Sequence, residues 1–178
     1  MVATHNHFKR APGRRAGYSS GMLEQVYNKE ILRLAADIPL TRRLQDPDAT
    51  ATAVSRLCGS RVVVDIKMKN GVVSDFGHDV KACALGQASS SIMARNIIGS
   101  SAEELREVGA AMRTMLHDNG APPEGKWSAL AILEPVRDFK ARHASTLLTF
   151  DAVEKAIAEI ESRCGPGAAD RQTSHATA

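Results

Sequence analysis

Cysteine is the residue type with the most specific chemistry in this chain, and Cys83 has the most informative neighbours. A strand-like run leads into it, and the small residues over 84–91 are predicted to open a helix that other backbone can approach closely. A thiol at a helix N-terminus faces unpaired N–H groups and the positive end of the helix dipole, which favour the thiolate. Since the thiolate binds metals and attacks sulfur, this stretch predicts a functional thiol, although a buried structural cysteine also fits it.

Cys58 lies at a predicted corner between two strands, in the segment Cys58-Gly59-Ser60. Residues 49–57, rich in threonine, alanine and valine, can form an edge strand before this corner. Over residues 62–68 apolar and polar side chains alternate, which is the period of a half-buried strand. The corner therefore joins two neighbouring antiparallel strands.

The hairpin signal that follows decides where the two cysteines lie in the sheet. Asn70-Gly71 is the strongest short hairpin signal, because a type I′ turn needs positive φ at both central residues. A partner strand over 72–80 then completes a three-stranded antiparallel meander. Since the hairpin turn lies at one end of this sheet, Cys58 and Cys83 are both predicted at the other end, as a pair of thiols.

Helical patterns surround the predicted sheet in the sequence. They cover residues 23–36, a helix opened by a capping box at Ser101 and Glu104, a short apolar helix over 127–133 ended by Pro135, and a long helix over 144–160. We therefore expect an α+β fold, with a small antiparallel sheet covered by helices from both ends of the chain. The folded domain is expected over residues 22–162, between flexible tails over 1–21 and 163–178.

Composition excludes several classes of function. The net charge of +3 and an aromatic content of 4% argue against a nucleic-acid partner. No apolar run is long enough to span a membrane, and the N-terminus has no apolar segment typical of a secretory signal. The three widely spaced cysteines form an odd count that fits a reducing compartment, so a cytoplasmic protein is expected.

Five short motifs occur in an order that is similar to a known family, the NifU-like and IscU-like iron–sulfur cluster assembly scaffold proteins of the SUF type. The resemblance covers most of the chain between residues 23 and 160. The motifs lie at residues 26–32, at the Cys58 corner, at Cys83 with the serines 89–91, at 99–104 and at 142–147. The resemblance implies the same α+β fold and the function of a scaffold or carrier, rather than a catalyst, that binds iron or a cluster and passes it to apoproteins.

The resemblance also implies which residues hold the cargo. Cys58, Cys83 and His143 match family ligand positions, and the cargo is expected to be a transient [2Fe–2S] cluster, with zinc as an alternative. Two family ligands are missing, because Ser60 stands in place of an aspartate and Ala144 in place of a third cysteine. Two thiolates and one imidazole leave a four-coordinate metal one ligand short.

Several sources of the missing ligand stay open. Within the chain, His78, Asp79 and Cys164 are weaker candidates. Water, a small thiol, a second protomer in a homodimer or a partner protein are the external ones. A cysteine desulfurase and recipient apoproteins are the partners that the resemblance implies.

Two other functions also stay open. One is a zinc or thiol sulfur-transfer protein in which Cys83 is the nucleophile and His143 its base. The other is a degenerate binding module that keeps the fold without a cluster.

Overall fold

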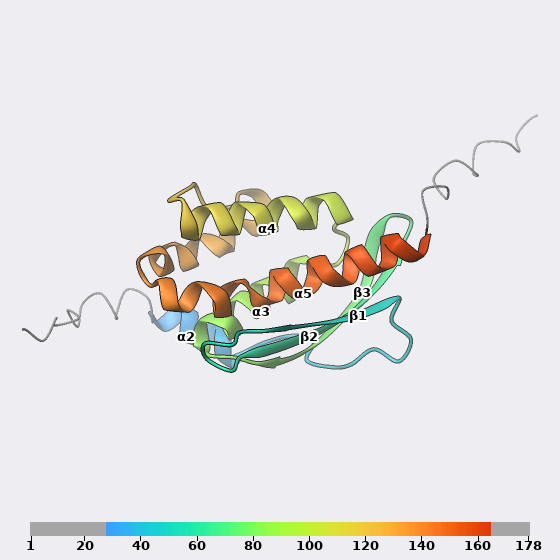
Figure 1. Cartoon of the computed structure of the whole chain (residues 1–178), viewed down its shortest axis with the longest axis horizontal. Coiled ribbons are helices and arrows are strands. Elements are labelled where there is room, and N and C mark those ends of the chain that lie inside the picture. The colour runs from blue at the N-terminus through green and yellow to red at the C-terminus, as the bar shows by residue number, and fades with distance from the viewer. Residues whose placement is uncertain (1–27, 165–178) are drawn as a thin grey trace, which may run out of the picture.

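Three antiparallel strands form one sheet in the computed structural model, which describes residues 28–164 (Figure 1). The strands are β1 (Ala49–Val54), β2 (Arg61–Lys69) and β3 (Val72–Lys81), with β2 in the centre. Asn70 and Gly71 have φ angles of 53° and 78°, so the predicted hairpin turn is confirmed. The predicted meander is confirmed as well, since each strand pairs antiparallel with the next along the chain.

Helices pack against this sheet in layers. They are α2 (Lys29–Ala36), α3 (Ala84–Asn96), α4 (Ala102–His117), the 3₁₀ helix η1 (Gly125–Asp138) and α5 (Lys140–Cys164). Figure 1 shows α5 lying along the sheet, with α4 on the far side of α5. The buried core between these layers confirms the predicted α+β fold; its largest fully buried side chains include Phe76, Phe150, Ile31, Leu85 and Met112.

The central strand is more deeply buried than the alternating pattern predicted. Asp65, on the face predicted to be polar, has no exposed surface. Its carboxylate accepts hydrogen bonds from the Arg43 guanidinium (2.6 and 2.8 Å), the Leu44 N–H (3.0 Å) and the Thr50 hydroxyl (2.6 Å). The prediction of a half-buried strand is therefore wrong at this point, because the segment between α2 and β1 crosses and covers the second face.

Two helix boundaries also differ from the predicted ones. The 3₁₀ helix η1 continues through Pro135 to Asp138, because the fixed φ of proline is compatible with 3₁₀ geometry. The long helix begins at Lys140 rather than at residue 144, so His143 lies inside its first turn. Pro135 therefore lies inside η1, and the charged residues Lys140 and Arg142 lie inside α5.

The ends of the predicted domain can be compared only in part. Residues 1–27 and 165–178 lie outside the described residues, and with them both predicted tails and the start of the helix predicted over 23–36. At the other end, α5 continues to Cys164, two residues beyond the predicted boundary at 162. Within residues 28–164, no helix has both the length and the apolar character that a membrane crossing requires.

Candidate functional site

Cys83 occupies the position that the sequence predicted for it, at the start of a helix. It is the N-cap residue of α3, with an extended backbone and no hydrogen bond from its side chain to the helix N–H groups. Its Sγ instead lies 3.3 Å from the Oγ of Ser145, a buried residue in the first turns of α5. Because the Ser145 hydroxyl donates to the Arg142 carbonyl (3.1 Å), its oxygen is free to accept the thiol proton of Cys83.

Close packing of α3 against α5 fixes this contact. A Cβ atom at Gly86 would lie 2.8 Å from the Ser145 carbonyl oxygen, so only glycine fits between the two helices here. Three residues further along α3, the Ser89 hydroxyl donates to the Thr146 carbonyl at 2.8 Å. The small residues after Cys83 therefore do what the sequence predicted, which is to let another backbone approach.

Cys58 lies in the exposed corner between β1 and β2. The next residue, Gly59, turns the chain with a positive φ of 70°. Its Sγ is 3.3 Å from Ser55 Oγ and 3.1 Å from Ser60 Oγ, and both serines are buried. The thiol can donate its one proton to only one of these oxygens, whereas a thiolate can accept hydrogen bonds from both hydroxyls. Hydrogen bonds from Ser55 and Ser60, with a weaker contribution from the Arg142 charge, hold the pKa of the Cys58 thiol below its usual value.

Two residues in the first two turns of α5 lie near the two thiols. Arg142 is close enough to Cys58 for its charge to act on that thiol, and Ser145 contacts Cys83. The strand register agrees, because Arg61, after the Cys58 corner, pairs with Lys81 just before Cys83. In Figure 1 this corner and the start of α5 lie at the same end of the molecule, so the predicted shared end is confirmed.

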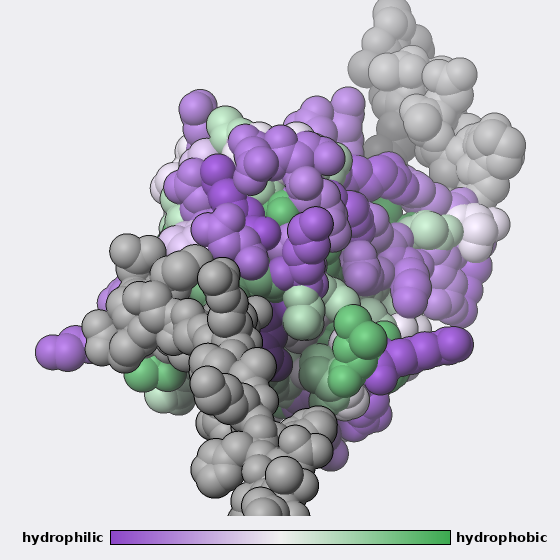
Figure 2. Space-filling model, turned by 60° about the vertical axis from the view of Figure 1, so that its left-hand side comes forward, coloured by the Kyte–Doolittle hydropathy of each residue, from purple (hydrophilic) through white to green (hydrophobic). Residues whose placement is uncertain are grey.

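The surface at this end combines positive charge with apolar side chains. Arg56, Lys81 and Arg142 have no ion-pair partner among residues 28–164, whereas Asp79 is paired with Arg61 at 2.9 Å. Leu57, next to Cys58, is 79% exposed, the most exposed large apolar side chain in the described part of the chain. Figure 2, turned to bring this end forward, shows green apolar patches beside purple hydrophilic ones.

The His143 ring is buried and engaged by the ends of α4 and η1. Its side chain is only 4% exposed, and its Nε2 lies 3.1 Å from both the Val136 and the Arg137 carbonyl oxygens at the end of η1. Because carbonyls only accept, Nε2 carries the proton, and Nδ1 accepts from the Nδ1–H of His117 at 3.3 Å. Both ring nitrogens are therefore occupied by contacts with the ends of α4 and η1.

The structure thus brings Cys58 and Cys83 to one end of the sheet without gathering them with His143 into one metal-ligating group. Within residues 28–164, no three His, Cys, Asp or Glu side chains are arranged to hold a metal ion. Two of the weaker candidates are engaged elsewhere, since His78 Nε2 donates to the Pro39 carbonyl and Asp79 pairs with Arg61. The ligand role of the three predicted residues stays a prediction.

Local sequence patterns did not point to the polar side chains near the thiols, of which Ser55 and Ser145 contact a sulfur and Arg142 acts through its charge. Ser55, Ser145 and Arg142 were not singled out, although Ser145 directly follows Ala144, the position that the resemblance gave as the missing third cysteine. That neighbouring position was the only available signal. In the structure, the α5 side chain that contacts Cys83 is the Ser145 hydroxyl.

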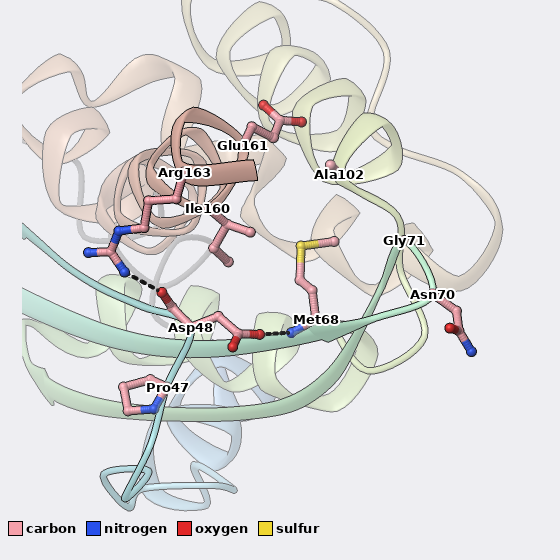
Figure 3. A pocket seen from close by; sticks show the side chains of 9 residues that line it. All are labelled: Pro47, Asp48, Met68, Asn70, Gly71, Ala102, Ile160, Glu161 and Arg163. Atoms are coloured by element: carbon pink, nitrogen blue, oxygen red, sulfur yellow. Dashed lines mark hydrogen bonds between the residues drawn. The ribbon is translucent and has the colours of Figure 1, made fainter. Parts of the chain in front are cut away.

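A cavity of about 740 Å³ lies at the other end of the molecule, beside the hairpin turn (Figure 3). Met68 and Ile160 form part of its apolar lining. At its rim, Asp48 accepts from the Met68 N–H at 2.7 Å and from Arg163 at 2.8 Å. Neither Cys58 nor Cys83 lines this cavity, so it is separate from the thiol site.

The fold and the paired thiols define a small thiol-bearing α+β domain. The chain belongs to the family described as NifU-like N terminal domain, whose model matches residues 26–145. Among solved structures, the N-terminal part of a nitrogen-fixing NifU-like protein from Brucella abortus is 57% identical. It superposes with a TM-score of 0.79, covering 80% of this chain and 99% of that one.

More distant relatives carry functional names. The chain is 24% identical over 139 residues to the iron-sulfur cluster assembly scaffold protein IscU of Thermotoga maritima, which covers 78% of this chain and 97% of the relative. It is 25% identical over 104 residues to the zinc-dependent sulfurtransferase SufU of Bacillus subtilis, and this match covers 58% of this chain and 71% of the relative. A solved structure of a putative iron-sulfur cluster assembly scaffold protein for the SUF system, from Fervidobacterium islandicum, has a TM-score of 0.70. It covers 75% of this chain and 98% of that one, and at 19% identity it supports the fold alone.

Proposed function

We propose that this chain is an iron–sulfur cluster assembly scaffold that receives iron and sulfide, holds a transient cluster and passes it to apoproteins. The observation that carries the proposal is the placement of two thiols, Cys58 and Cys83, at one end of a NifU-like domain, both near the start of α5. A relative that covers 78% of this chain is named as a scaffold of this kind. The cytoplasm is the compartment that the odd cysteine count predicts.

The residues around the thiols suit a metal-bound cargo. Hydroxyls of Ser55 and Ser60 donate to Cys58 when it is ionised, and thiolate is the form that ligates iron or zinc. The unpaired cations near the site, Arg56, Lys81 and Arg142, offset the negative charge of two thiolates. The proposed cargo is a [2Fe–2S] cluster, and the proposed partners are a cysteine desulfurase and recipient apoproteins.

His143 is the third ligand proposed from the sequence. To bind a metal, its ring would have to give up the hydrogen bonds to His117 and to two carbonyls of η1. A His143→Ala variant separates the two roles of this ring. If His143 is a ligand, the variant should bind less metal per chain. If His143 only packs, the variant should keep its metal content and lose free energy of unfolding, by roughly 1–3 kcal/mol for the lost buried hydrogen bonds.

Anaerobic reconstitution with ferrous iron and sulfide tests the proposal. The protein is expected to gain visible absorbance together with bound iron and sulfide, and to transfer both to an apo-ferredoxin. Cys58→Ser and Cys83→Ser should abolish binding, because a hydroxyl does not ionise near neutral pH. Cys164→Ser is the matched control, since it removes the same group from the far end of α5.

The sulfur-transfer function is the second candidate, favoured only by the similarity to SufU, which is named as zinc-dependent. It predicts bound zinc and a persulfide on a cysteine after incubation with a cysteine desulfurase, without visible absorbance. A protein that binds neither zinc nor a cluster under these conditions would contradict both candidates and leave a binding module with this fold.

A further inference from the structure

The strand β1 forms an edge of the sheet, and the outer side of this edge is open. The N–H of Ser55 donates to the Ser60 carbonyl at 2.8 Å, which continues the pairing of β1 with β2. Because antiparallel pairing alternates, every second residue of β1 turns its backbone N–H and C=O away from β2. These residues are Thr50, Thr52 and Val54. Among residues 28–164 no strand pairs with this side of β1, so its backbone groups are available to a further strand.

The sequence of β1 lacks the features that usually block the addition of a strand. Natural edge strands are commonly protected by charged side chains or proline within the strand. β1 reads ATATAV, with neither a charge nor a proline, and its outward-facing side chains are exposed. Threonine and valine, which occupy the exposed positions, are residues that favour strands. This edge is therefore suited to pairing with another chain.

We propose that two copies of this chain pair through the edges of β1, antiparallel about a two-fold axis at Thr52. The Thr52 residues of the two copies then face each other, and Thr50 of each copy lies opposite Val54 of the other. Opposing residues exchange backbone hydrogen bonds, so the two sheets become one continuous sheet. The contact uses neither a thiol nor a metal, and it is independent of the proposed function.

The two ends of β1 carry complementary charges. Arg56, two residues after β1, is exposed and has no ion-pair partner within the described residues. Asp48, directly before β1, is exposed, and its carboxylate accepts the Met68 N–H at 2.7 Å. Antiparallel pairing brings the Arg56 end of each copy beside the Asp48 end of the other, so the same attraction occurs twice. This complementarity favours a second copy of the chain as the partner.

Apolar groups at the two ends of β1 are complementary as well. Leu57, next to Arg56, is 79% exposed. Pro47 and Asp48 lie on the β1 side of the cavity of about 740 Å³, whose lining includes Met68 and Ile160 (Figure 3). Within one chain Leu57 and this cavity lie beyond opposite ends of β1, whereas antiparallel pairing brings Leu57 of each copy to the cavity rim of the other. Burial of the leucine there would stabilise the dimer.

Lys155 limits the strength of the contact. Its Nζ donates to the Thr52 carbonyl at 3.5 Å, which shows that this carbonyl points outward. A carbonyl oxygen has two lone pairs, so it can accept a second hydrogen bond from the other copy. Both Lys155 side chains then lie near the two-fold axis, where their like charges repel each other. We therefore expect a weak, reversible dimer that Lys155→Gln tightens several-fold.

Sedimentation velocity of the full chain across micromolar concentrations tests the proposal. A chelator and a reductant keep the protein free of metal and of disulfides, and a reversible equilibrium between monomer and dimer is expected. Thr52→Pro removes an N–H that pairing with β2 does not use, so the monomer should keep its fold. The dissociation constant of the dimer should rise at least about tenfold, since two backbone hydrogen bonds are lost. Thr52→Val is the matched control and should dimerise at least as well as the original chain.

A charge exchange tests the orientation of the two copies. Arg56→Glu alone and Asp48→Lys alone should each be monomeric, because each brings like charges together at both ends of the contact. A mixture of the two variants should form a mixed dimer, which native mass spectrometry identifies by its mass. Circular dichroism and thermal melting check the fold, since Asp48→Lys gives up the hydrogen bond to the Met68 N–H.

A further variant tests the apolar part of the contact. Leu57→Lys should weaken the dimer, because a charge replaces the leucine at the cavity rim of the other copy. Ile98→Lys is the matched control, because Ile98 is 48% exposed after the C-terminal end of α3, and it should dimerise as the original chain does.

Three results would overturn the proposal. The first is an original chain that stays monomeric across the whole concentration range, which would leave the edge without a second copy. The second is a dimer that Thr52→Pro leaves unchanged, which would place the contact elsewhere on the surface. The third is a mixture of Arg56→Glu and Asp48→Lys that forms no mixed dimer, which would exclude the antiparallel arrangement. None of these results bears on cluster uptake, which tests the proposed function separately.

Discussion

The Ser145 hydroxyl oxygen lies 3.3 Å from the Cys83 sulfur, although the two residues are 62 positions apart in the chain. This contact identifies which residue of α5 faces the thiol site. The resemblance had placed the missing third cysteine at Ala144, one residue earlier. Successive residues in a helix are rotated by about 100°, so a cysteine at position 144 and a cysteine at position 145 would lie on different faces of α5.

Ser145→Cys should therefore add a third thiolate beside Cys83 and tighten metal binding. We expect zinc affinity to rise by at least about tenfold, since an added thiolate supplies both charge and a soft ligand. Competition with a chromophoric chelator, in reducing buffer, measures the change. Ala144→Cys is the matched comparison and should change affinity less. A larger gain from Ala144→Cys would show that the contact between Ser145 and Cys83 does not define the site.

Gly86→Ala should destabilise the protein where α3 crosses α5. The new methyl would meet the Ser145 carbonyl and the Ala82 methyl at 2.8 Å, and neither is the end of a flexible side chain. Overpacking of this kind costs about 1–3 kcal/mol. Gly109→Ala is the comparison, because its methyl meets only the ends of side chains, the Glu154 carboxylate and the Arg113 guanidinium, so it displaces their ion pair and not backbone. Urea unfolding of both variants should show a larger loss for Gly86→Ala than for Gly109→Ala, because an ion pair of partly exposed groups contributes at most about 1 kcal/mol.

The thiol of Cys58 should react with iodoacetamide at a lower pH than an ordinary cysteine. Its pKa is lowered by the Ser55 and Ser60 hydroxyls, so more thiolate is present near neutral pH. Alkylation rates of the metal-free protein across pH, in a background with the other two cysteines replaced by serine, give the midpoint. Ser60→Ala should move the midpoint upward. An unchanged midpoint would mean that the Ser60 hydroxyl does not lower the pKa of the Cys58 thiol.

Acidification should destabilise the protein through His78. Burial lowers the pKa of this ring. Among residues 28–164 its Nδ1 has no hydrogen-bond partner, while Nε2 donates to the Pro39 carbonyl at 2.9 Å. The unfolded state therefore binds the proton more readily. Stability is fully present above the unfolded pKa of about 6.5 and falls as the pH drops toward the folded value, by up to about 1.4 kcal/mol per pH unit.

Urea unfolding at several pH values between 7 and 5 measures this loss. His78→Gln keeps a side-chain donor for the carbonyl and removes the titrating ring, so it should flatten the pH dependence. The difference between the curves of the two proteins isolates the contribution of His78. An equal slope in the variant would show that the His78 ring does not cause the pH dependence.

Local signals in the sequence were enough to predict the sheet and the start of two helices. Asn70-Gly71 specified the hairpin because positive φ is a property of those two residues, wherever the rest of the chain lies. Likewise, the capping box was confirmed when the Ser101 hydroxyl accepted the Glu104 N–H at 3.1 Å. The meander then followed, and with it the placement of Cys58 and Cys83 at one end of the sheet.

Only the tertiary structure decided what surrounds those two thiols. Whether Ser145 or His143 faces Cys83 depends on the rotation of α5 against α3, and Gly86 fixes that rotation through a contact with a distant segment. Asp65 became buried for the same kind of reason, because the segment before β1 packs across the sheet. Side-chain direction follows from packing between segments far apart in the sequence, and periodicity within one segment does not contain that information.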